Sequence, residues 1–420
     1  MALGIACAVA PPNAHAQLRH PAIPSATVPH SVGINIHFTD PLEGEMAMLA
    51  ATGAKWIRMD FKWGQTERVR GVYDFSAYER LLSHLEKHDL RAVFIFDYGN
   101  KLYSDVSPAT PESRAAYARW AAAAAQKFAG RGVLWEIWNE PNIGFWRPQP
   151  NPADYVALVK ETATAVRAVA PGEALIAPAI ARFDWPFLEA CFRLGMLDFL
   201  DAVSIHPYRN TVPETVSADY GRLREMIQKH GPKNRELPIL SGEWGYTSQA
   251  KERSEAVQAR FLTRQWLSNL ASGVPLSIWY DWRDDGLDAN ERENRFGLVR
   301  HPHFPQRTPV FAAKPAYFAA QTFVDELNGF TFAQRIANAN DAAKNDWILR
   351  FSRGSESVFA VWTTAHDASA PGFDKTLRPR VYKLPPNTKW RVVSHLGEEL
   401  PPAQNEIALA SAPLFLKIVG

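Results

Sequence analysis

The stretch WEIWNEPNIGFW, residues 135–146, places two acids inside an apolar run. Glu136 and Glu140 stand among three tryptophans and a phenylalanine. Such a run usually excludes charge, because burying an unpaired carboxylate is strongly unfavourable. We therefore read residues 133–140, VLWEIWNE, as a strand whose acids have either a chemical function or a buried partner.

Seven similar runs accompany this one, and longer helix-like segments separate them. Between the runs, apolar residues recur every three or four positions, as on one face of a helix. Eight strand–helix units in roughly 300 residues predict a (β/α)8 TIM barrel, an α/β fold, which we place at residues 17–330. The alternative is a doubly wound open sheet, which predicts fewer strands and a glycine-rich phosphate loop after the first strand. The segment HFTDPLEGE after the first run is no such loop. The candidate strands are VGINIHF (32–38), WIRMDF (56–61), RAVFIFDY (91–98), VLWEIWNE (133–140), ALIAPAI (174–180), DAVSIHPY (201–208), LPILSGEWGY (237–246) and VPLSIWYDW (274–282).

The pattern changes after the helical segment KPAYFAAQTFVDELNG, residues 314–329. Short runs of alternating polarity follow, broken by Gly, Pro and Asn, and they predict an all-β sandwich at residues 331–420. The runs are DWILRF, SVFAVW, RVYKL, KWRVV, NEIAL and PLFLKIV. No low-complexity linker precedes them, so we expect the sandwich to pack directly on the barrel.

Charge and composition exclude several classes of partner. The 46 Lys and Arg residues nearly balance the 44 Asp and Glu residues, for a formal net charge of +2. This balance does not favour nucleic acid or an anionic membrane surface. No stretch after the N-terminal segment is apolar and long enough to span a bilayer. We expect a monomer whose partner is a small or polymeric substrate.

The first residues, MALGIACAVAPPNAHAQ, resemble a secretory leader. A short apolar part precedes Ala14-His15-Ala16, an A-x-A cleavage pattern, although no Lys or Arg precedes the apolar part. We expect residues 1–16 to be a truncated signal peptide and the protein to be exported, to the periplasm or outside the cell.

Polar side chains gather at the ends of the predicted strands, where barrel enzymes place their active sites. Two of them, Glu140 after the fourth run and Glu243 after the seventh, suggest a reaction. Cleaving an acetal needs a proton for the leaving oxygen and a carboxylate that meets the developing oxocarbenium ion. Two carboxyls on nearly opposite strands could supply both. The other polar residues at strand ends are Asn35, His37, Arg58, Asp60, Asp97, Tyr98, Asn139, His206, Tyr208, Trp279, Asp281 and Trp282.

The sequence WNEPN at 138–142, followed by SGEWG at 241–245, resembles clan A of the glycoside hydrolases. In that clan an Asn-Glu pair ends the fourth strand and a lone Glu ends the seventh. The longer stretch at 135–146, together with SIHPYR at 204–209, resembles family 39 most closely, with family 5 as the near alternative. The resemblance extends from Val32 to about Gly286, and it implies a retaining O-glycosyl hydrolase that uses no cofactor.

The resemblance also implies roles for individual residues. Glu140 is then the general acid/base and Glu243 the nucleophile. Asn139 would bind the sugar 2-hydroxyl, and Arg58 and Tyr208 would hold Glu243 ionised and oriented. The remaining substrate-binding candidates are His206, which would lie near the acid/base or the sugar, Trp279 as the floor of the −1 subsite, its neighbour Trp282, and His37.

Three functional readings remain open at this stage. The first is an endo-acting hydrolase of a polysaccharide, such as a bacterial exopolysaccharide, because many aromatic residues fall in loops at the mouth. The second is an exo-acting glycosidase of the β-xylosidase type, and the third is a catalytically silent carbohydrate-binding barrel. Four arginines could also read uronates: Arg147, Arg182, Arg209 and Arg283. The mouth aromatics are Tyr98, Tyr103, Phe145, Trp146, Phe183, Trp185, Trp244, Tyr246 and Trp282.

Two other kinds of site are disfavoured. His301 and His303 lack a third metal ligand at useful spacing, and DDGLDANE at 284–291 fails the EF-hand spacing, so we expect no metal. No G-x-S-x-G stretch supports a serine hydrolase.

The spacing of Glu136 and Glu140 divides their roles. Side chains alternate along a strand, so Glu136, Trp138 and Glu140 are expected on one face. At ~3.3 Å per residue, Glu136 lies roughly 13 Å below Glu140. We therefore expect Glu136 to be a buried structural acid with a cationic or donor partner.

Overall fold

The computed structural model describes residues 19–249, 251–303, 311–338, 344–368 and 380–419. The expected leader at residues 1–16 lies outside the described residues. No helix among the described residues has the length and apolar character needed to cross a lipid bilayer.

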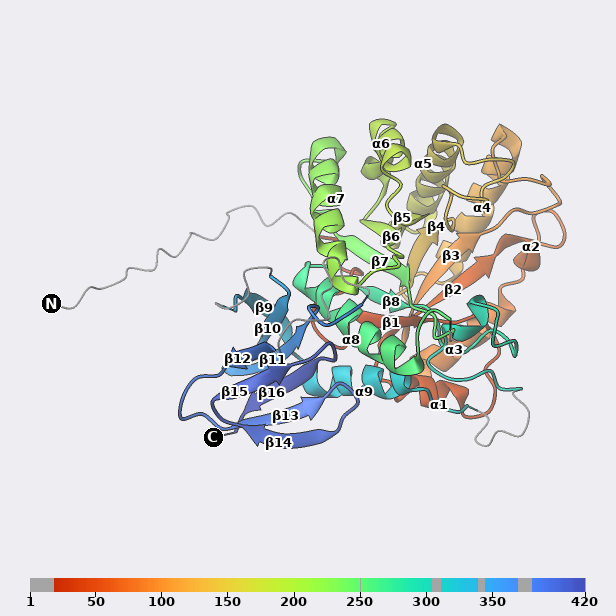
Figure 1. Cartoon of the computed structure of the whole chain (residues 1–420). Coiled ribbons are helices and arrows are strands. Elements are labelled where there is room, and N and C mark those ends of the chain that lie inside the picture. The colour runs from red at the N-terminus through yellow and green to blue at the C-terminus, as the bar shows by residue number, and fades with distance from the viewer. Residues whose placement is uncertain (1–18, 250, 304–310, 339–343, 369–379, 420) are drawn as a thin grey trace.

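Eight parallel strands close into a barrel, as predicted (Figure 1). Closure comes from β1 pairing with β8, with Gly33 opposite Ile278. A Cβ on Gly33 would clash with Trp56 and Ile278, so glycine permits this close approach. The strands are β1 (Val32–Asn35), β2 (Trp56–Lys62), β3 (Arg91–Asp97), β4 (Leu134–Ile137), β5 (Ala174–Ala181), β6 (Ala202–His206), β7 (Ile239–Trp244) and β8 (Ser277–Trp279).

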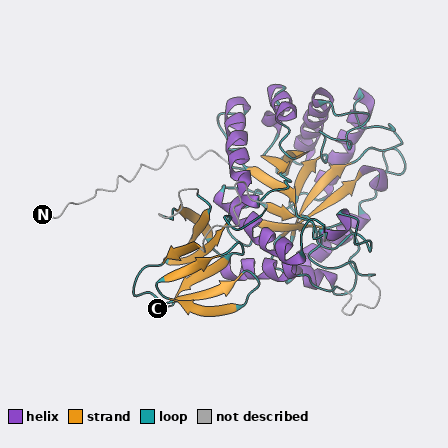
Figure 2. Cartoon of the chain, viewed as in Figure 1, coloured by secondary structure: helices purple, strands orange, loops and turns teal. Residues whose placement is uncertain are grey.

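Helices surround the barrel, as Figure 2 shows. Their start signals are local: Asn151 caps α5 by accepting from the backbone N–H groups of Ala153 and Asp154, and Pro152 occupies the first turn. The helices are α1 (Glu45–Ala50), α2 (Trp63–Thr66), α3 (Ser76–Lys87), α4 (Pro111–Lys127), α5 (Pro152–Val169), α6 (Trp185–Arg193), α7 (Val216–His230), α8 (Glu255–Ala271) and α9 (Pro315–Leu327), with 3-10 turns η1 (Met196–Phe199), η2 (Pro213–Thr215) and η3 (Glu293–Arg295).

Alternation along the strands separates two apolar layers. Trp56, Leu134 and Ile278 belong to a small cluster inside the barrel. Trp135 and Trp279 belong to the larger cluster that also contains the inner faces of the helices. Residues two or four positions further along the same strands therefore also point toward the barrel axis, at the carboxyl ends of the strands.

The C-terminal part contains two antiparallel sheets that lie beside α8 and α9 (Figure 1). Arg391 and Lys417 of the larger sheet form ion pairs with Glu326 of α9. The larger sheet has the order β14-β13-β16-β11-β10-β9 and the smaller one pairs β12 with β15. The strands are β9 (Thr331–Ile336), β10 (Asp346–Arg353), β11 (Glu356–Thr363), β12 (Arg380–Lys383), β13 (Trp390–Ser394), β14 (Glu399–Ala403), β15 (Glu406–Leu409) and β16 (Leu414–Ile418).

Two of these strands, β9 and β14, are absent from the runs read in the sequence. Both are edge strands of the larger sheet. β14 contains Pro401 and Pro402, which an edge strand tolerates because one side of its ladder is unpaired. Their alternation is correspondingly weak.

Candidate active site

Arg58 organises the carboxyl end of the barrel. It projects from β2 toward the axis with its side chain only 1% exposed. All five of its N–H groups have acceptors. Nε donates to Oε2 of Glu136 at 2.7 Å, Nη1 to Oε2 of Glu243 at 2.6 Å and to Asn35 at 3.3 Å, and Nη2 to Asn139 at 2.8 Å and to Nε2 of His206 at 3.1 Å. Burial by itself lowers the pKa of Arg58, but Glu136 and Glu243 raise it above its ordinary value. The guanidinium is therefore a permanent cation that fixes its neighbours.

Glu243 receives two hydrogen bonds from different elements. Arg58 donates to Oε2, and the hydroxyl of Tyr208, just after β6, donates to Oε1 at 2.8 Å. Burial and the carboxylate of Glu243 raise the pKa of Tyr208 well above its ordinary value, so its hydroxyl keeps its proton and can donate. The Glu243 side chain is still 14% exposed. It is thus held in position and open to a ligand.

Glu140 is held by His206, whose Nδ1 lies 2.9 Å from its Oε1. Because an arginine N–H can only donate, the contact between Arg58 Nη2 and His206 Nε2 makes Nε2 an acceptor. The ring proton is therefore on Nδ1, and His206 donates to Glu140.

The two acids lie close enough to act on one bond. One carboxylate oxygen of Glu140 and one of Glu243 lie within 4.8 Å of each other. Carboxyl groups about 5–5.5 Å apart fit a double displacement with retention, whereas inverting enzymes need roughly 6.5–9.5 Å for a water molecule. The separation therefore favours the retaining geometry.

The chain after β4 departs from the alternation expected for a strand. β4 ends at Ile137, and both Trp138 and Glu140 have left-handed φ values, 68° and 48°. Trp138 packs edge-on against Trp146 and Tyr98 in the core, away from Glu136. The expectation that Trp138 shares a face with both glutamates is therefore wrong. Non-glycine residues with left-handed φ values carry strain that the surrounding structure must support. Here the left-handed backbone turns both Asn139 and Glu140 toward the barrel axis.

Glu136 is confirmed as a buried acid with a cationic partner. Its side chain is 0% exposed and ion-pairs with Arg58. Its other oxygen lies near the backbone of Gly242, where an added Cβ would approach it to 3.1 Å and would clash with Ser204. Glycine at this point of β7 therefore makes room for the buried pair.

A cavity of about 880 Å³ opens above these residues. Glu140, Glu243, Arg58, Asn139, Tyr208 and His37 line it, whereas His206 is fully buried behind them. The rest of the lining comes from strand ends and from the segments that follow the strands: Asn35, Asp60, Tyr98, Ile143, Phe145, Ala181, Arg182, Arg209, Asn210, Glu252, Arg253, Tyr280, Arg292, Glu293 and Phe296.

A family model, Cellulase (glycosyl hydrolase family 5), matches residues 28–286. The match covers more than half of the chain and includes all eight strands of the barrel, β1 to β8. The chain belongs to this family. It is a glycoside hydrolase, and the retaining mechanism is typical of the clan to which family 5 belongs.

Solved structures share the fold of this family 5 protein. A family 39 glycoside hydrolase from the gut symbiont Bacteroides cellulosilyticus WH2 has a TM-score of 0.78 at 23% identity, covering 93% of this chain and 81% of its own. A family 39 β-xylosidase from Caulobacter crescentus has a TM-score of 0.66 at 18% identity, covering 94% and 97%. A family 39 enzyme from Xanthomonas axonopodis pv. citri has a TM-score of 0.65 at 17% identity, covering 94% and 96%. A search of curated proteins finds no match.

The aromatic residue that the family 5 chain presents to the cavity directly after β8 is Tyr280. Trp279 is fully buried and faces the helix layer, and Trp282 is fully buried with its indole N–H on Glu45 at 3.0 Å. Neither lines the cavity, so placing them in the substrate site is wrong. Ile278 points into the barrel, and alternation brings Tyr280 back to the same side. Counting from Ile278 would have found it.

Most of the other predicted mouth aromatics are packing residues in this glycosidase. Tyr98 and Phe145 do line the cavity, stacked at 5.6 Å. Trp146, Trp244 and Tyr246 are buried, Phe183 and Trp185 stack on each other, and Tyr103 stacks on Trp63. Of the four arginines considered for uronates, Arg182 and Arg209 line the cavity, Arg147 lines a neighbouring pocket, and Arg283 pairs with Glu45.

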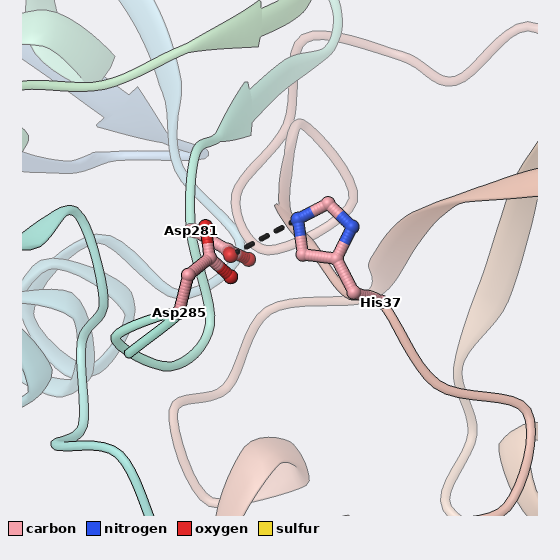
Figure 3. Close-up of side chains that lie close together, drawn as sticks. All are labelled: His37, Asp281 and Asp285. Carbon is pink, nitrogen blue, oxygen red and sulfur yellow. Dashed lines mark ion pairs between the residues drawn. The ribbon is translucent and has the colours of Figure 1, made fainter. Parts of the chain in front are cut away.

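His37, Asp281 and Asp285 form a charged cluster beside the cavity (Figure 3). Nε2 of His37 lies 3.1 Å from Oδ2 of the buried Asp281. Burial lowers the pKa of His37, but Asp281, with smaller contributions from Asp285 and Asp60, raises the pKa to about 9 overall. Burial and Asp281 raise the pKa of Asp285 to about 7. The imidazolium therefore supplies the cation that the two carboxyls need.

Asp97, the other acid considered at a strand end, is fully buried. Burial and then the neighbouring Asp60 raise the pKa of Asp97 well above its ordinary value. Asp60 itself lines the cavity. Asp97 therefore lies buried near Asp60 and does not line the cavity.

Sequence reasoning missed a group of cavity residues in loops. Glu252, Arg253, Arg292, Glu293 and Phe296 lie after β7 and β8, far from the strand ends in sequence. No motif or periodic pattern marks such positions, because their place in the cavity depends on how long loops fold back.

Proposed function

We propose that this glycoside hydrolase cuts a polysaccharide internally, with Glu243 as nucleophile and Glu140 as general acid/base. The observation that supports the proposal most is the pair of carboxyls within 4.8 Å of each other at the floor of a cavity of about 880 Å³. This volume is near the upper end for ligand pockets, roughly 300–1,000 Å³. It offers more room than one sugar ring needs.

In the first step, an oxygen of Glu243 attacks the anomeric carbon while the bond to the leaving oxygen breaks. Glu140 donates its proton to that oxygen, so a glycosyl-enzyme ester and a free hydroxyl form. In the second step Glu140 takes a proton from water, the water oxygen attacks the anomeric carbon, and Glu243 leaves as a carboxylate. His206, donating to Glu140, and Arg58 and Tyr208, donating to Glu243, keep the two acids in place.

The remaining substrate roles follow from which hydrogen-bonding groups are not already used within the protein. The five donors of Arg58 are all used within the protein, so Arg58 positions Glu243 and does not itself bind sugar. Asn139 accepts from Arg58 and donates to Tyr98, which aims its amide at the cavity for a sugar hydroxyl. His37 and Tyr280 lie on the β1 and β8 side of the cavity and complete the subsite.

The test of the chemistry uses Glu243→Gln and Glu140→Gln on an activated aryl glycoside. Removing the nucleophile should lower kcat/KM about 10³-fold or more. Turnover of both variants within tenfold of the wild type would refute the assignment. Proton NMR of the first product should show the anomeric configuration of the substrate.

An exo-acting β-xylosidase is the second candidate, since the similar Caulobacter crescentus structure is a β-xylosidase. Product size separates the two: oligosaccharides from an early polymer digest support endo action, and single sugars support exo action. A panel of bacterial and plant polysaccharides would identify the polymer.

We also propose that the protein is an exported monomer. The A-x-A pattern at Ala14-His15-Ala16 supports export. N-terminal sequencing of the protein from the medium and from a periplasmic extract tests this, and gel filtration tests the monomer.

A further inference from the structure

A fully buried charged junction connects the barrel to the C-terminal sheets. Arg264 of α8 is 0% exposed and donates to both oxygens of Glu214, from Nε at 2.6 Å and from Nη2 at 2.8 Å. Its Nη1 donates to Asp367, just after β11, at 2.7 Å. The indole N–H of Trp362 on β11 donates to Oε1 of Glu214 at 2.6 Å. Glu214 is therefore held from two parts of the chain at once.

The geometry of this junction is more precisely defined than is needed simply to hold the C-terminal sheets against the barrel. Elsewhere the contact between sheets and barrel uses partly exposed ion pairs, such as Arg391 with Glu326. Here an arginine forms a two-pronged pair with one carboxylate, and the tryptophan adds a third donor to it. Such bidentate pairs fix direction as well as distance. The position of Glu214 is thus set to within a narrow range by Trp362 and Arg264.

Glu214 lies at one end of the loop that carries Tyr208. Arg209 ties the two ends of this loop together, because its Nε donates to the carbonyl of Pro207 at 3.1 Å and its Nη1 donates to Oγ1 of Thr215 at 2.9 Å. At the other end, Tyr208 donates to Glu243 at 2.8 Å. A displacement of η2, which contains Glu214, therefore also moves Tyr208, whose hydroxyl orients Glu243.

We propose that Trp362 of the C-terminal sheet is a positioning residue for the reaction, acting on Glu243 through Glu214 and the Tyr208 loop. Asp367 supports the same function by holding Arg264. The inference rests on the proposed role of Glu243 as nucleophile. It gives the C-terminal sheets a part in catalysis although none of their described residues lines the cavity.

The alternative is that the junction only joins the two parts of the protein. Trp362→Phe removes the indole donor and keeps most of the ring. Trp390→Phe is its matched control, since Trp390 is also buried in the larger sheet and its indole N–H has no partner among the described residues. Kinetics on an aryl glycoside are measured well below both unfolding temperatures. We expect Trp362→Phe to lower kcat about tenfold with little change in KM, and Trp390→Phe to change kcat less than about twofold.

A double-mutant cycle with Tyr208→Phe decides the route. If Trp362 acts through Tyr208, adding Trp362→Phe to Tyr208→Phe should lower kcat/KM by less than about twofold further. Equal losses in both backgrounds would overturn the proposal, and so would equal effects of Trp362→Phe and Trp390→Phe. If Trp362→Phe does not fold, Asp367→Asn replaces it in the same cycle. A fully active Glu243→Gln variant would instead refute the nucleophile itself, which keeps the two failures distinct.

Discussion

The guanidinium Nε of Arg58 lies 2.7 Å from Oε2 of Glu136, and both side chains are almost completely buried. Glu136 cannot reach the cavity, yet it neutralises part of the cation that holds Glu243. Breaking a buried pair by removing one partner is much more harmful than lacking the pair altogether, because one charge stays buried without compensation. The pair therefore links the stability of the barrel to the geometry of the site.

Arg58→Met should lower the free energy of unfolding by about 3–5 kcal/mol, because the charge of Glu136 loses its partner. It should also lower kcat/KM by more than about 10², because Glu243 and Asn139 lose a donor. Urea unfolding and aryl glycoside kinetics measure the two effects. Adding Glu136→Gln to Arg58→Met should restore part of the stability and none of the activity. Recovery of activity in the double variant would contradict this division.

Tyr280 and Trp282 should respond differently to substitution. Tyr280→Ala removes a ring from the cavity wall and should raise KM about tenfold with unchanged stability, since such aromatic contacts contribute about 0.5–1.5 kcal/mol. Trp282→Phe removes the hydrogen bond to Glu45 and should lower the free energy of unfolding by about 1 kcal/mol with unchanged KM. A rise in KM for Trp282→Phe would return that residue to the substrate site.

The pH dependence of stability should contain a contribution from His37. Its folded-state pKa is raised from 6.5 to about 9, so the folded protein holds this proton more tightly than the unfolded chain does. The stabilisation is fully present below pH 6.5 and is lost as the pH rises through about 9. Thermal unfolding of the wild type and His37→Gln should therefore differ most near pH 6 and converge above pH 9. His84→Gln, on the outer helix α3, is the control and should follow the wild type. A difference that does not change with pH would refute the role of this proton.

Phe145 should matter for a polymer and not for a small substrate. Its side chain is 45% exposed and lines the cavity next to Tyr98. Phe145→Ala should raise KM for the polysaccharide about fivefold to tenfold and leave an aryl monoglycoside within twofold. Phe318→Ala, at a residue 47% exposed on α9 and outside the cavity, is the matched control. Equal effects on both substrates would argue against an extended binding cleft.

Much of the barrel was predictable because it depends on local signals. The eight runs of apolar residues correspond to β1–β8, and the acids at 140 and 243 follow β4 and β7 closely enough to be brought together by the closure of the barrel. Period-2 alternation also correctly predicted that Glu136 is buried inside. These features require only a strand and its direction.

The errors arise where the backbone leaves the strand or where position depends on distant segments. The left-handed φ of Trp138 turns its ring outward, and no glycine or other residue type in that stretch predicts such a backbone. On β8 the family resemblance implied Trp279 as the subsite floor, whereas the strand turns Trp279 toward the helices and brings Tyr280 to the cavity. Arg253 and Arg292 reach the cavity only because long loops fold back over it, and sequence spacing contains no record of that.

The junction between Arg264 and Asp367 also has a consequence for the order of synthesis. A chain leaves the ribosome N-terminus first, and Asp367 follows Arg264 by 103 residues (367 − 264). At ~5–20 residues per second this takes about 5–20 s. During that interval Glu214 and Arg264 have each other but lack Trp362 and Asp367. A ribosome-bound barrel thus carries an incomplete junction, and with Trp362 as a positioning residue the site reaches its final geometry only after β11 and Asp367 have emerged.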